Sequence, residues 1–390
     1  MNSIINFFRK ARIHFLRKVL EKGGKFDMAM VKPAPSFLGK LMSPLRNWLI
    51  PSERFEYIYT GPMGFAVLRA ACNIGVFELL DKKPGLKIAE IAEALKLEEY
   101  PAKLLLMALV SIKMIYKIGD EYYGDPFLVK PLLKDSCDGF MLKQLEYTHH
   151  LIAPAMHCLQ ESIIKNKPVG LTHLFGENAG NYYYEVAQDS ERNRCFEQFM
   201  NSFSQINQPR IASMSVFSRF KKILDVGGNT GALAMSIARN HPDVKITVFD
   251  FPSVVESAKK NFKENQLDNR LDAIGGNILE SPLPQGYDCV IFSHFIDLLS
   301  EKMNKELIQK AMQSLVPGGT LFIFSPIVND EETEPFLNCM MGLYFLCLAN
   351  GVGQFYSGKT IMDWMKEAGF HKLEKRLLPF DEAVFTGQKP

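Results

Sequence analysis

Hydrophobic and polar positions follow two different patterns on either side of residue 218. After it, short apolar runs alternate with segments in which apolar residues recur at helical spacing. The runs predict strands at 223–226, 245–249, 289–292, 320–324 and around 383–385. The other segments predict helices at 232–240, 254–265, 305–315 and 359–368. This alternation is typical of an α/β fold with a largely parallel sheet, so residues 218–390 are expected to form one domain.

Before residue 218 the pattern is mostly helical, and residues 56–217 are expected to form a second domain. Within it, two amphipathic runs at 88–95 and 101–110 precede a hairpin-like stretch at 114–123. Helix, turn, helix and a small β-wing make a winged-helix pattern. A helix that reads a DNA groove exposes basic and amide side chains, but the second helix carries only Lys103 among Leu, Met and Ala. We therefore expect a dimerisation role and no nucleic-acid partner.

Residues 1–55 are expected to form a basic amphipathic extension. Between Ile4 and Leu20 the apolar residues recur near helical spacing, with arginines and lysines between them. Prolines end this pattern before Pro51. Three interpretations stand for the extension: it packs on another subunit, makes weak contact with an anionic membrane surface, or is a solvated helix.

Composition narrows the class of protein. The 390 residues are 47% apolar and 23% charged, as in globular proteins. A net charge of +2 does not suggest a chain that neutralises many phosphates. The seven cysteines are widely spaced without a CxxC pair, so neither a disulfide framework nor a thiolate zinc site is expected. This usage indicates a reducing compartment, the cytoplasm, and no uncharged apolar run is long enough to predict a membrane span.

The candidate chemistry lies at the ends of the predicted strands. Residues 224–231 read LDVGGNTG, a strand that runs into a glycine-rich turn and then a helix. Asp250 ends the next strand, where a carboxylate can accept both hydroxyls of a ribose. A third loop, Gly275-Gly276-Asn277-Ile278, fits the place of an adenine. Ligands of such sheets bind beyond the carboxyl ends of the strands, so these features together predict a nucleoside-type cofactor.

These motifs resemble those of the class I S-adenosylmethionine-dependent O-methyltransferases. The similarity is greatest to the group of plant phenolic and hydroxyindole O-methyltransferases and bacterial tailoring enzymes. It rests on DVGGNTG, VFDFPSVV, GGNILESPLP, LVPGGTLFI and MKEAGF, and on NIGVFELLDKKPG in the helical segment. The resemblance implies a Rossmann-like methyltransferase domain, a mostly helical N-terminal winged-helix dimerisation domain, a homodimer, and S-adenosylmethionine as the cofactor.

The resemblance also implies which residues hold the cofactor. Asp225 and the glycines of the turn would surround the methionine and ribose, Asp250 would hold the ribose diol, and Phe251 would lie beside the adenine. The full set of implied cofactor-binding residues is Asp225, Gly227, Gly228, Gly231, Asp250, Phe251, Asn277, Ile278 and Ser293.

The sequence departs from the family at the catalytic positions. The family usually carries a Leu-His-Asp-Trp segment with His as the general base, and a Glu after the next strand that orients it. Here Asp297 stands in the His position, His294 lies three residues earlier, and Ser325 stands in the Glu position. Asp297 and His294 are therefore the candidate catalytic residues, and which of them is the base stays open.

Aromatic, thioether and imidazole side chains are expected to line the acceptor site. The predicted substrate-binding residues are His149, His150, Met200, Met340, Met341, Phe345 and Tyr356. Such side chains suit a flat, apolar molecule of small size. The histidines lack a further ligand at a typical spacing, so no metal is expected.

The sequence thus predicts a methyltransferase that acts on a small, aromatic molecule in specialised metabolism. Methylation of oxygen fits the family best, and methylation of carbon or nitrogen fits the loss of the His/Glu base pair. The alternative is an S-adenosylmethionine-binding homologue that no longer methylates and serves other chemistry or a scaffold role.

Overall fold

The structure, a computed structural model, describes residues 52–134 and 140–390. These residues form two compact units that divide between Lys134 and Asp135. The basic extension predicted for residues 1–55, with its membrane-surface contact, lies almost entirely outside the described residues. Among the described residues, no single helix is long and apolar enough to span a membrane, although the bent pair Gly61–Ile74 and Val76–Lys82 passes that test together.

The first unit contains the predicted winged-helix pattern. Its elements are α4 (Ser52–Tyr59), α5 (Gly61–Ile74), α6 (Val76–Lys82), α7 (Ile88–Leu95), α8 (Glu99–Ser111), β1 (Ile115–Ile118), β2 (Glu121–Gly124), α9 (Pro126–Val129) and η2 (Lys130–Leu132). β1 and β2 pair as an antiparallel hairpin with Ile118 opposite Glu121. Helices α7 and α8 pack against each other, as expected for the helix–turn–helix part.

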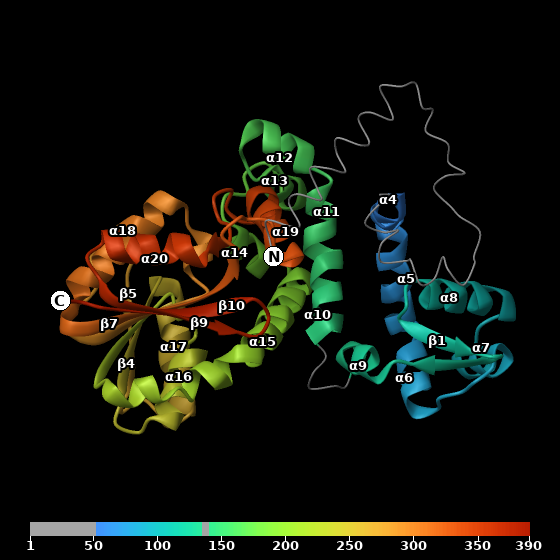
Figure 1. Ribbon diagram of the computed structural model, residues 1–390, viewed down its shortest axis with the longest axis horizontal. Coiled ribbons are helices and arrows are strands. Elements are labelled where there is room, and N and C mark those ends of the chain that lie inside the picture. Colours follow the sequence, from blue (N-terminus) through green and yellow to red (C-terminus); the bar gives the residue numbers. More distant parts are fainter. Residues whose placement is uncertain (1–51, 135–139) are drawn as a thin grey trace, which may run out of the picture. The chain divides into compact units, whose positions relative to one another are not determined.

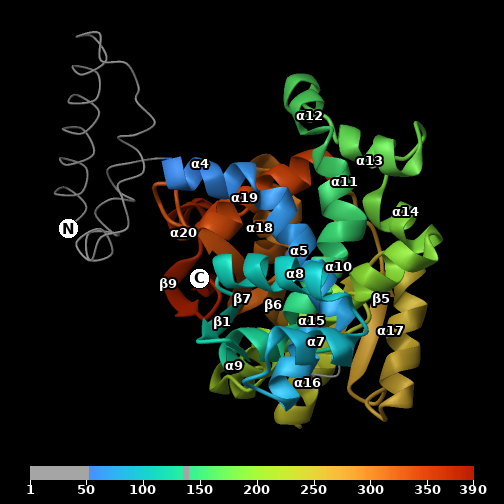
Figure 2. The ribbon, with the colours of Figure 1, turned by 90° about the vertical axis from the view of Figure 1, so that its right-hand side faces the viewer.

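The second unit opens with helices that pack on a later part of the same unit. They are α10 (Phe140–Tyr147), η3 (Thr148–Ile152), α11 (Ala153–Met156), α12 (Leu159–Lys165), α13 (Val169–Phe175), α14 (Tyr182–Gln188), α15 (Ser190–Ala212) and η4 (Ser215–Arg219). Helices α11, α12 and α13 lie side by side in both views (Figure 1, Figure 2). Helices α11 and α13 share an aromatic core with α19 (Phe336–Tyr344) and η6 (Phe345–Ala349), which follow the central strands of the sheet, and α12 contacts η6.

The compact units therefore differ from the predicted division at 217/218. The Tyr147 hydroxyl in α10 donates a hydrogen bond of 2.9 Å to the Tyr344 hydroxyl in α19. Contacts of this kind join the helices before residue 217 to the sheet that follows, so residues 140–390 make one compact unit.

An eight-stranded sheet forms the centre of the second unit. Its strands are β3 (Lys222–Val226), β4 (Lys245–Asp250), β5 (Leu271–Gly275), β6 (Tyr287–Ser293), β7 (Leu315–Val328), β8 (Tyr356–Ser357), β9 (His371–Leu378) and β10 (Glu382–Gln388). The order is β5-β4-β3-β6-β7-β10-β9, with β8 beside β7. Strands β3 to β7 are parallel, whereas β10 runs antiparallel between β7 and β9. The order reverses between β3 and β6, which is where α/β sheets bind ligands.

Helices cover both faces of this sheet (Figure 1). On one face α18 (Glu301–Ser314) and α20 (Gly358–Glu367) pack on Leu224 and Val226 of β3. On the other face α16 (Ala232–Asn240) and α17 (Pro252–Glu264) pack on Ile223. Successive residues of a strand point to opposite faces of the sheet. Because helices cover both faces, the residues of β3 are buried without interruption from Ile223 onward. The α/β fold with a largely parallel sheet that the alternation predicts is confirmed, and so is the Rossmann-like domain that the resemblance implies.

Candidate functional site

The glycine-rich turn after β3 is tightly packed. Gly227 and Gly231 adopt φ angles of 72° and 82°, which side chains other than glycine rarely tolerate. A Cβ atom on Gly227 would overlap the ring of Phe295, and one on Gly231 would overlap the ring of Phe262. The turn therefore needs glycine at both positions, and it leads directly into the N-terminus of α16.

Asp225 is a buried carboxylate beneath this turn. Its exposed fraction is 1%, and neither carboxylate oxygen has a hydrogen-bond partner in the protein. Burial, and secondarily the charge of Asp250, raises the pKa of Asp225 to about 7. A buried carboxylate without a partner is costly, so this group suits a ligand that brings a positive charge or a hydrogen-bond donor.

Asp250 closes β4 beside the same turn. One carboxylate oxygen accepts the backbone N–H of Asn229 at 2.8 Å, and the other accepts that of Phe251 at 2.7 Å. Burial raises the pKa of Asp250, and these two bonds oppose that rise. Each oxygen keeps a further lone pair, as recognition of a diol requires. The ring of Phe251 remains 48% exposed next to it.

The remaining predicted cofactor residues follow β5 or end β6. The amide oxygen of Asn277 accepts the N–H of Leu279 at 3.1 Å and so shapes its own turn. The side chain of Ile278 packs in the core and its carbonyl accepts Lys310 Nζ at 2.8 Å, so its part in cofactor binding stays a prediction. Ser293 is the last residue of β6, in register with Phe324 of β7. Apart from the buried Ile278 side chain, the predicted residues gather at the carboxyl edge of the parallel strands.

His294 follows β6 in a left-handed conformation with a φ of 48°. Its backbone N–H donates to the carbonyl of Phe324 at 2.8 Å. Its Nε2 lies 2.8 Å from Oε1 of Glu382, although the N–H is not aligned for a linear hydrogen bond, so the contact is mainly electrostatic. Glu382 opens β10 and was not among the residues predicted from the sequence.

Asp297 lies in the single turn Ile296–Leu298 that comes soon after His294. It is 7% exposed, and its Oδ1 has no hydrogen-bond partner in the protein. Burial raises the pKa of Asp297, the charge of His294 lowers it, and that of Glu382 raises it. Burial, and secondarily the negative charge of Asp297, raises the pKa of Tyr183, so that hydroxyl belongs to the same neighbourhood. The structure thus brings both predicted catalytic residues together.

The predicted acceptor wall is only partly assembled. Phe345 and the partly buried Met341 belong to the aromatic core around Tyr344, and the Phe345 ring meets that of Phe355 at 5.7 Å. Met340 is exposed and Met200 is half-buried on α15.

Three residues of the predicted wall have other surroundings. Tyr356 is buried in the core beneath α18 and α20, where its hydroxyl donates to the carbonyl of Leu299 at 2.6 Å. Burial raises the pKa of that hydroxyl to about 12. His150 faces Glu146 at 3.4 Å and Glu191 at 3.9 Å, and the exposed His149 meets its ring edge-on. The two histidines thus face glutamates and each other, whereas Tyr356, although buried in the core, is still close enough to Asp297 for that charge to contribute to its raised pKa.

A buried network of tyrosine hydroxyls was missed by the sequence analysis. The hydroxyl of Tyr147 lies 2.8 Å from that of Tyr182 and donates to that of Tyr344 at 2.9 Å. Burial raises the pKa of all three hydroxyls well above its usual value. The run of three tyrosines at 182–184, directly after the helix-capping Asn181, was the available signal.

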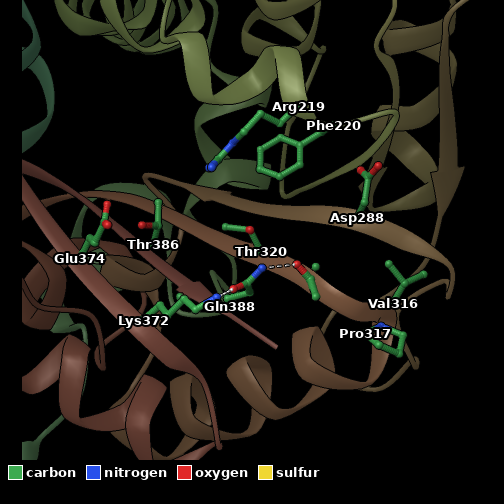
Figure 3. Close-up of a pocket in the computed structure, with 13 residues that line it drawn as sticks. Arg219, Phe220, Asp288, Val316, Pro317, Thr320, Lys372, Glu374, Thr386 and Gln388 are labelled. Atoms are coloured by element: carbon green, nitrogen blue, oxygen red, sulfur yellow. Dashed lines mark hydrogen bonds between the residues drawn. The ribbon is translucent and has the colours of Figure 1, made fainter. Parts of the chain in front are cut away.

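Among the described residues, no group of three or more His, Cys, Asp or Glu side chains is placed to hold a metal ion. A surface hollow of about 360 Å³ lies at the amino ends of the parallel strands, near the start of β6 (Figure 3). Arg219, Lys372, Asp288 and Glu374 are among the residues that line it, and Gln388 donates to the carbonyl of Gly318 at 2.9 Å. Because the glycine-rich turn and Asp250 end their strands at the opposite edge, this hollow is not part of the candidate site.

Comparison with known proteins fits this geometry. The family model of an O-methyltransferase domain matches residues 156–371, more than half of the chain, and that of a Dimerisation2-like domain matches residues 54–122. The chain is 26% identical to the L-tyrosine C(3)-methyltransferase of Streptomyces lavendulae over 82% of its own length and 87% of the relative's. It is 25% identical to the human acetylserotonin O-methyltransferase over 75% and 85% of the two chains. The solved structure of the S-adenosylmethionine-dependent methyltransferase SibL superposes with a TM-score of 0.78 and 26% identity, over 86% of this chain and 99% of that one.

Proposed function

The chain belongs to the O-methyltransferase domain family and is an S-adenosylmethionine-dependent methyltransferase, and we propose that its acceptor is a small aromatic molecule of specialised metabolism. The observation that carries the site assignment is the buried carboxylate of Asp225, which has no protein partner and lies under the glycine-rich turn. When bound, the cofactor supplies a methyl group that is activated by the positive charge of its sulfonium.

The cofactor-binding residues follow from charge and position. A cation favours the ionised form of a nearby carboxylate, so a positively charged cofactor compensates the burial of Asp225. Asp250, held by two backbone N–H groups, accepts the ribose hydroxyls. The exposed ring of Phe251 offers a face to the adenine, and Asn277 offers an amide. Gly227 and Gly231 let the backbone approach the ligand closely.

Two observations support an aromatic acceptor. Phe345, Met341 and the tyrosine hydroxyl network supply aromatic and polarisable groups in the same compact unit as Asp297. The relatives carry names that specify aromatic acceptors, among them L-tyrosine and a hydroxy-naphthoate. Asp297 and His294 stand where a proton acceptor is needed, because a phenol with a pKa near 10 is mainly protonated at neutral pH. A positioned base contributes roughly 10²–10⁴-fold to such a reaction.

The first unit supports a homodimer. Tyr100, Leu104 and Met107 of α8 lie on one helical face and are 72%, 46% and 55% exposed. This apolar face occupies the place of a DNA-reading helix without its chemistry, and it lies within the match to the Dimerisation2-like domain. A second copy of the chain is the occupant that fits both facts. Cysteine usage supports a reducing compartment, and we place the enzyme in the cytoplasm.

Binding of S-adenosylmethionine and transfer of its methyl group test the proposal together. Calorimetry should give specific binding to the wild-type chain and a loss of roughly 10–100-fold in Asp250→Ala, as expected for removing a buried acceptor. Asp272→Ala is the matched control, since Asp272 is an exposed carboxylate on the neighbouring strand. Labelled cofactor offered with a panel of phenols, catechols and aromatic amino acids should label at least one. Equal affinity in Asp250→Ala and the wild type would disprove the cofactor site.

A further inference from the structure

Glu382 is a buried acid at the start of an otherwise apolar strand. It is 2% exposed and pairs across the sheet with Pro326 of β7. The strand continues with Ala383, Val384 and Phe385, all of which belong to the hydrophobic cores. Burial of a carboxylate in such surroundings is unfavourable unless both of its oxygens are engaged.

Both oxygens of Glu382 face a polar group, Oε2 through a hydrogen bond and Oε1 through a short electrostatic contact. Asn207, a buried residue of α15, donates its amide N–H to Oε2, and the same nitrogen donates to the carbonyl of Pro379 at 3.1 Å. The other oxygen, Oε1, lies 2.8 Å from Nε2 of His294. An amide fixed by two acceptors therefore holds the carboxylate in the orientation that meets the imidazole.

The position of the His294 ring is itself constrained. The residue keeps a φ of 48°, its N–H is bonded to the carbonyl of Phe324, and its ring lies 4.5 Å from that of Phe324. Sparsely populated backbone conformations persist only where the surrounding structure determines them, and they gather at functional sites. The imidazole thus contacts both Glu382 and Phe324 of β7. Burial raises the pKa of the nearby Asp297 carboxyl, and the charge of His294 lowers it.

We propose that Glu382 is the positioning residue of His294, so that the two form a histidine–carboxylate pair displaced from the one typical of the family; this rests on the methyl-transfer function proposed above. Ser325, which stands at the family's Glu position, uses its hydroxyl to donate to the carbonyl of Pro326 at 3.0 Å. Ala383, next to Glu382, lies opposite Ser325 in the sheet. The carboxylate missing from β7 is therefore supplied by the adjacent strand.

The pair has a defined part in the reaction. Contact of Nε2 with Glu382 favours the tautomer that carries its proton on Nε2, which leaves Nδ1 as the basic nitrogen. For a hydroxyl acceptor, the proton passes to Nδ1, the oxygen forms the new bond to the methyl carbon, and the electrons of the broken carbon–sulfur bond remain on sulfur. Glu382 stabilises the imidazolium so formed. The negative charge of Asp297, which is electrostatically coupled to His294, acts on the imidazolium in the same direction.

The test compares Glu382→Gln with Glu374→Gln in the full-length protein. Glu374 is an exposed acid on the adjacent strand β9, so the control removes the same charge outside the pair. The ring protons of His294, assigned by their loss in His294→Ala, are titrated by NMR. Removing the anion should lower the midpoint measured for His294 in Glu382→Gln, and leave it unchanged in the control.

Kinetics supply the second measurement. Glu382→Gln should lower kcat by roughly 10–100-fold, shift the acid limb of the pH–rate profile to lower pH, and leave the affinity for S-adenosylmethionine unchanged. The double variant His294→Ala, Glu382→Gln should lose no more than His294→Ala alone, since the two residues act as one unit.

An unmoved His294 midpoint, or losses that simply add, would overturn the proposal. Failure of the wild-type chain to bind the cofactor or methylate any acceptor would instead refute the proposed function, because the NMR titration still decides the pairing without turnover. If circular dichroism shows that Glu382→Gln is unfolded, Glu382→Asp replaces it, with a smaller change expected in the same direction and an unmoved midpoint again refuting the pair.

Discussion

Replacement of Asp225 by asparagine should stabilise the folded chain at alkaline pH while weakening cofactor binding. The carboxylate is buried without a protein partner, and its pKa rises from 3.8 to about 7, mainly through burial. An acid whose pKa is raised by folding binds its proton more tightly in the folded state. The contribution of Asp225 to the free energy of unfolding is therefore most favourable below pH 3.8, and it is lost as the pH rises toward about 7.

The size of the effect follows from the pKa values of Asp225 in the unfolded and the folded chain. A difference of one between two pKa values corresponds to about 1.4 kcal/mol, so the ionised carboxylate destabilises the fold by up to about 4 kcal/mol above pH 7. At about pH 5 the same relation gives roughly 1.7 kcal/mol. Asp225→Asn removes the titration, so its stability relative to the wild type should increase by about 2.5 kcal/mol between about pH 5 and pH 8.

Urea unfolding of the cofactor-free protein at these two pH values measures the difference. Asp272→Asn is the matched control, because Asp272 is exposed on β5 of the same sheet, two strands from β3. The difference in unfolding free energy between this variant and the wild type should be the same at both pH values. Calorimetry on Asp225→Asn should show a loss of affinity for S-adenosylmethionine, whose positive charge the carboxylate would meet. A stability difference that is the same at both pH values would refute the reasoning.

Three further predictions concern catalysis, the turn and assembly. Asp297→Asn should lower kcat by about 10²–10⁴-fold without changing cofactor affinity if Asp297 is the base, whereas a larger loss in His294→Ala would assign that role to His294. Gly231→Ala should destabilise the fold by at least about 1 kcal/mol in urea unfolding, because its φ is 82° and a Cβ would overlap an aromatic ring, whereas Gly342→Ala, with open space around it, should not. Light scattering should give a dimer at micromolar concentration, and Met107→Glu should shift it toward the monomer; a monomeric wild-type chain would disprove the dimer.

Much of the fold and the cofactor site could be predicted from local sequence. The strand at 222–226, the glycine-rich turn and the helix from Ala232 are consecutive in the chain, so their spacing encodes their geometry. Asp225 and Asp250 end parallel strands, and parallel strands place their carboxyl ends at one edge of a sheet. The winged-helix pattern is likewise a local sequence of elements. In these cases periodicity and turn chemistry suffice, because no distant contact has to be known.

The catalytic neighbourhood depended on contacts between distant segments. Glu382 meets His294 only because β10 inserts antiparallel between β7 and β9, an order that the apolar run around 383–385 does not reveal. The same holds for Tyr356, whose type suits an acceptor wall but whose strand lies against the core. It also holds for His150, which meets not only Glu146 one turn away but also Glu191 of the distant helix α15. Sequence determined which chemical groups the chain carries at each strand end; strand order and side-chain packing, which involve the whole chain, decided which of those groups meet.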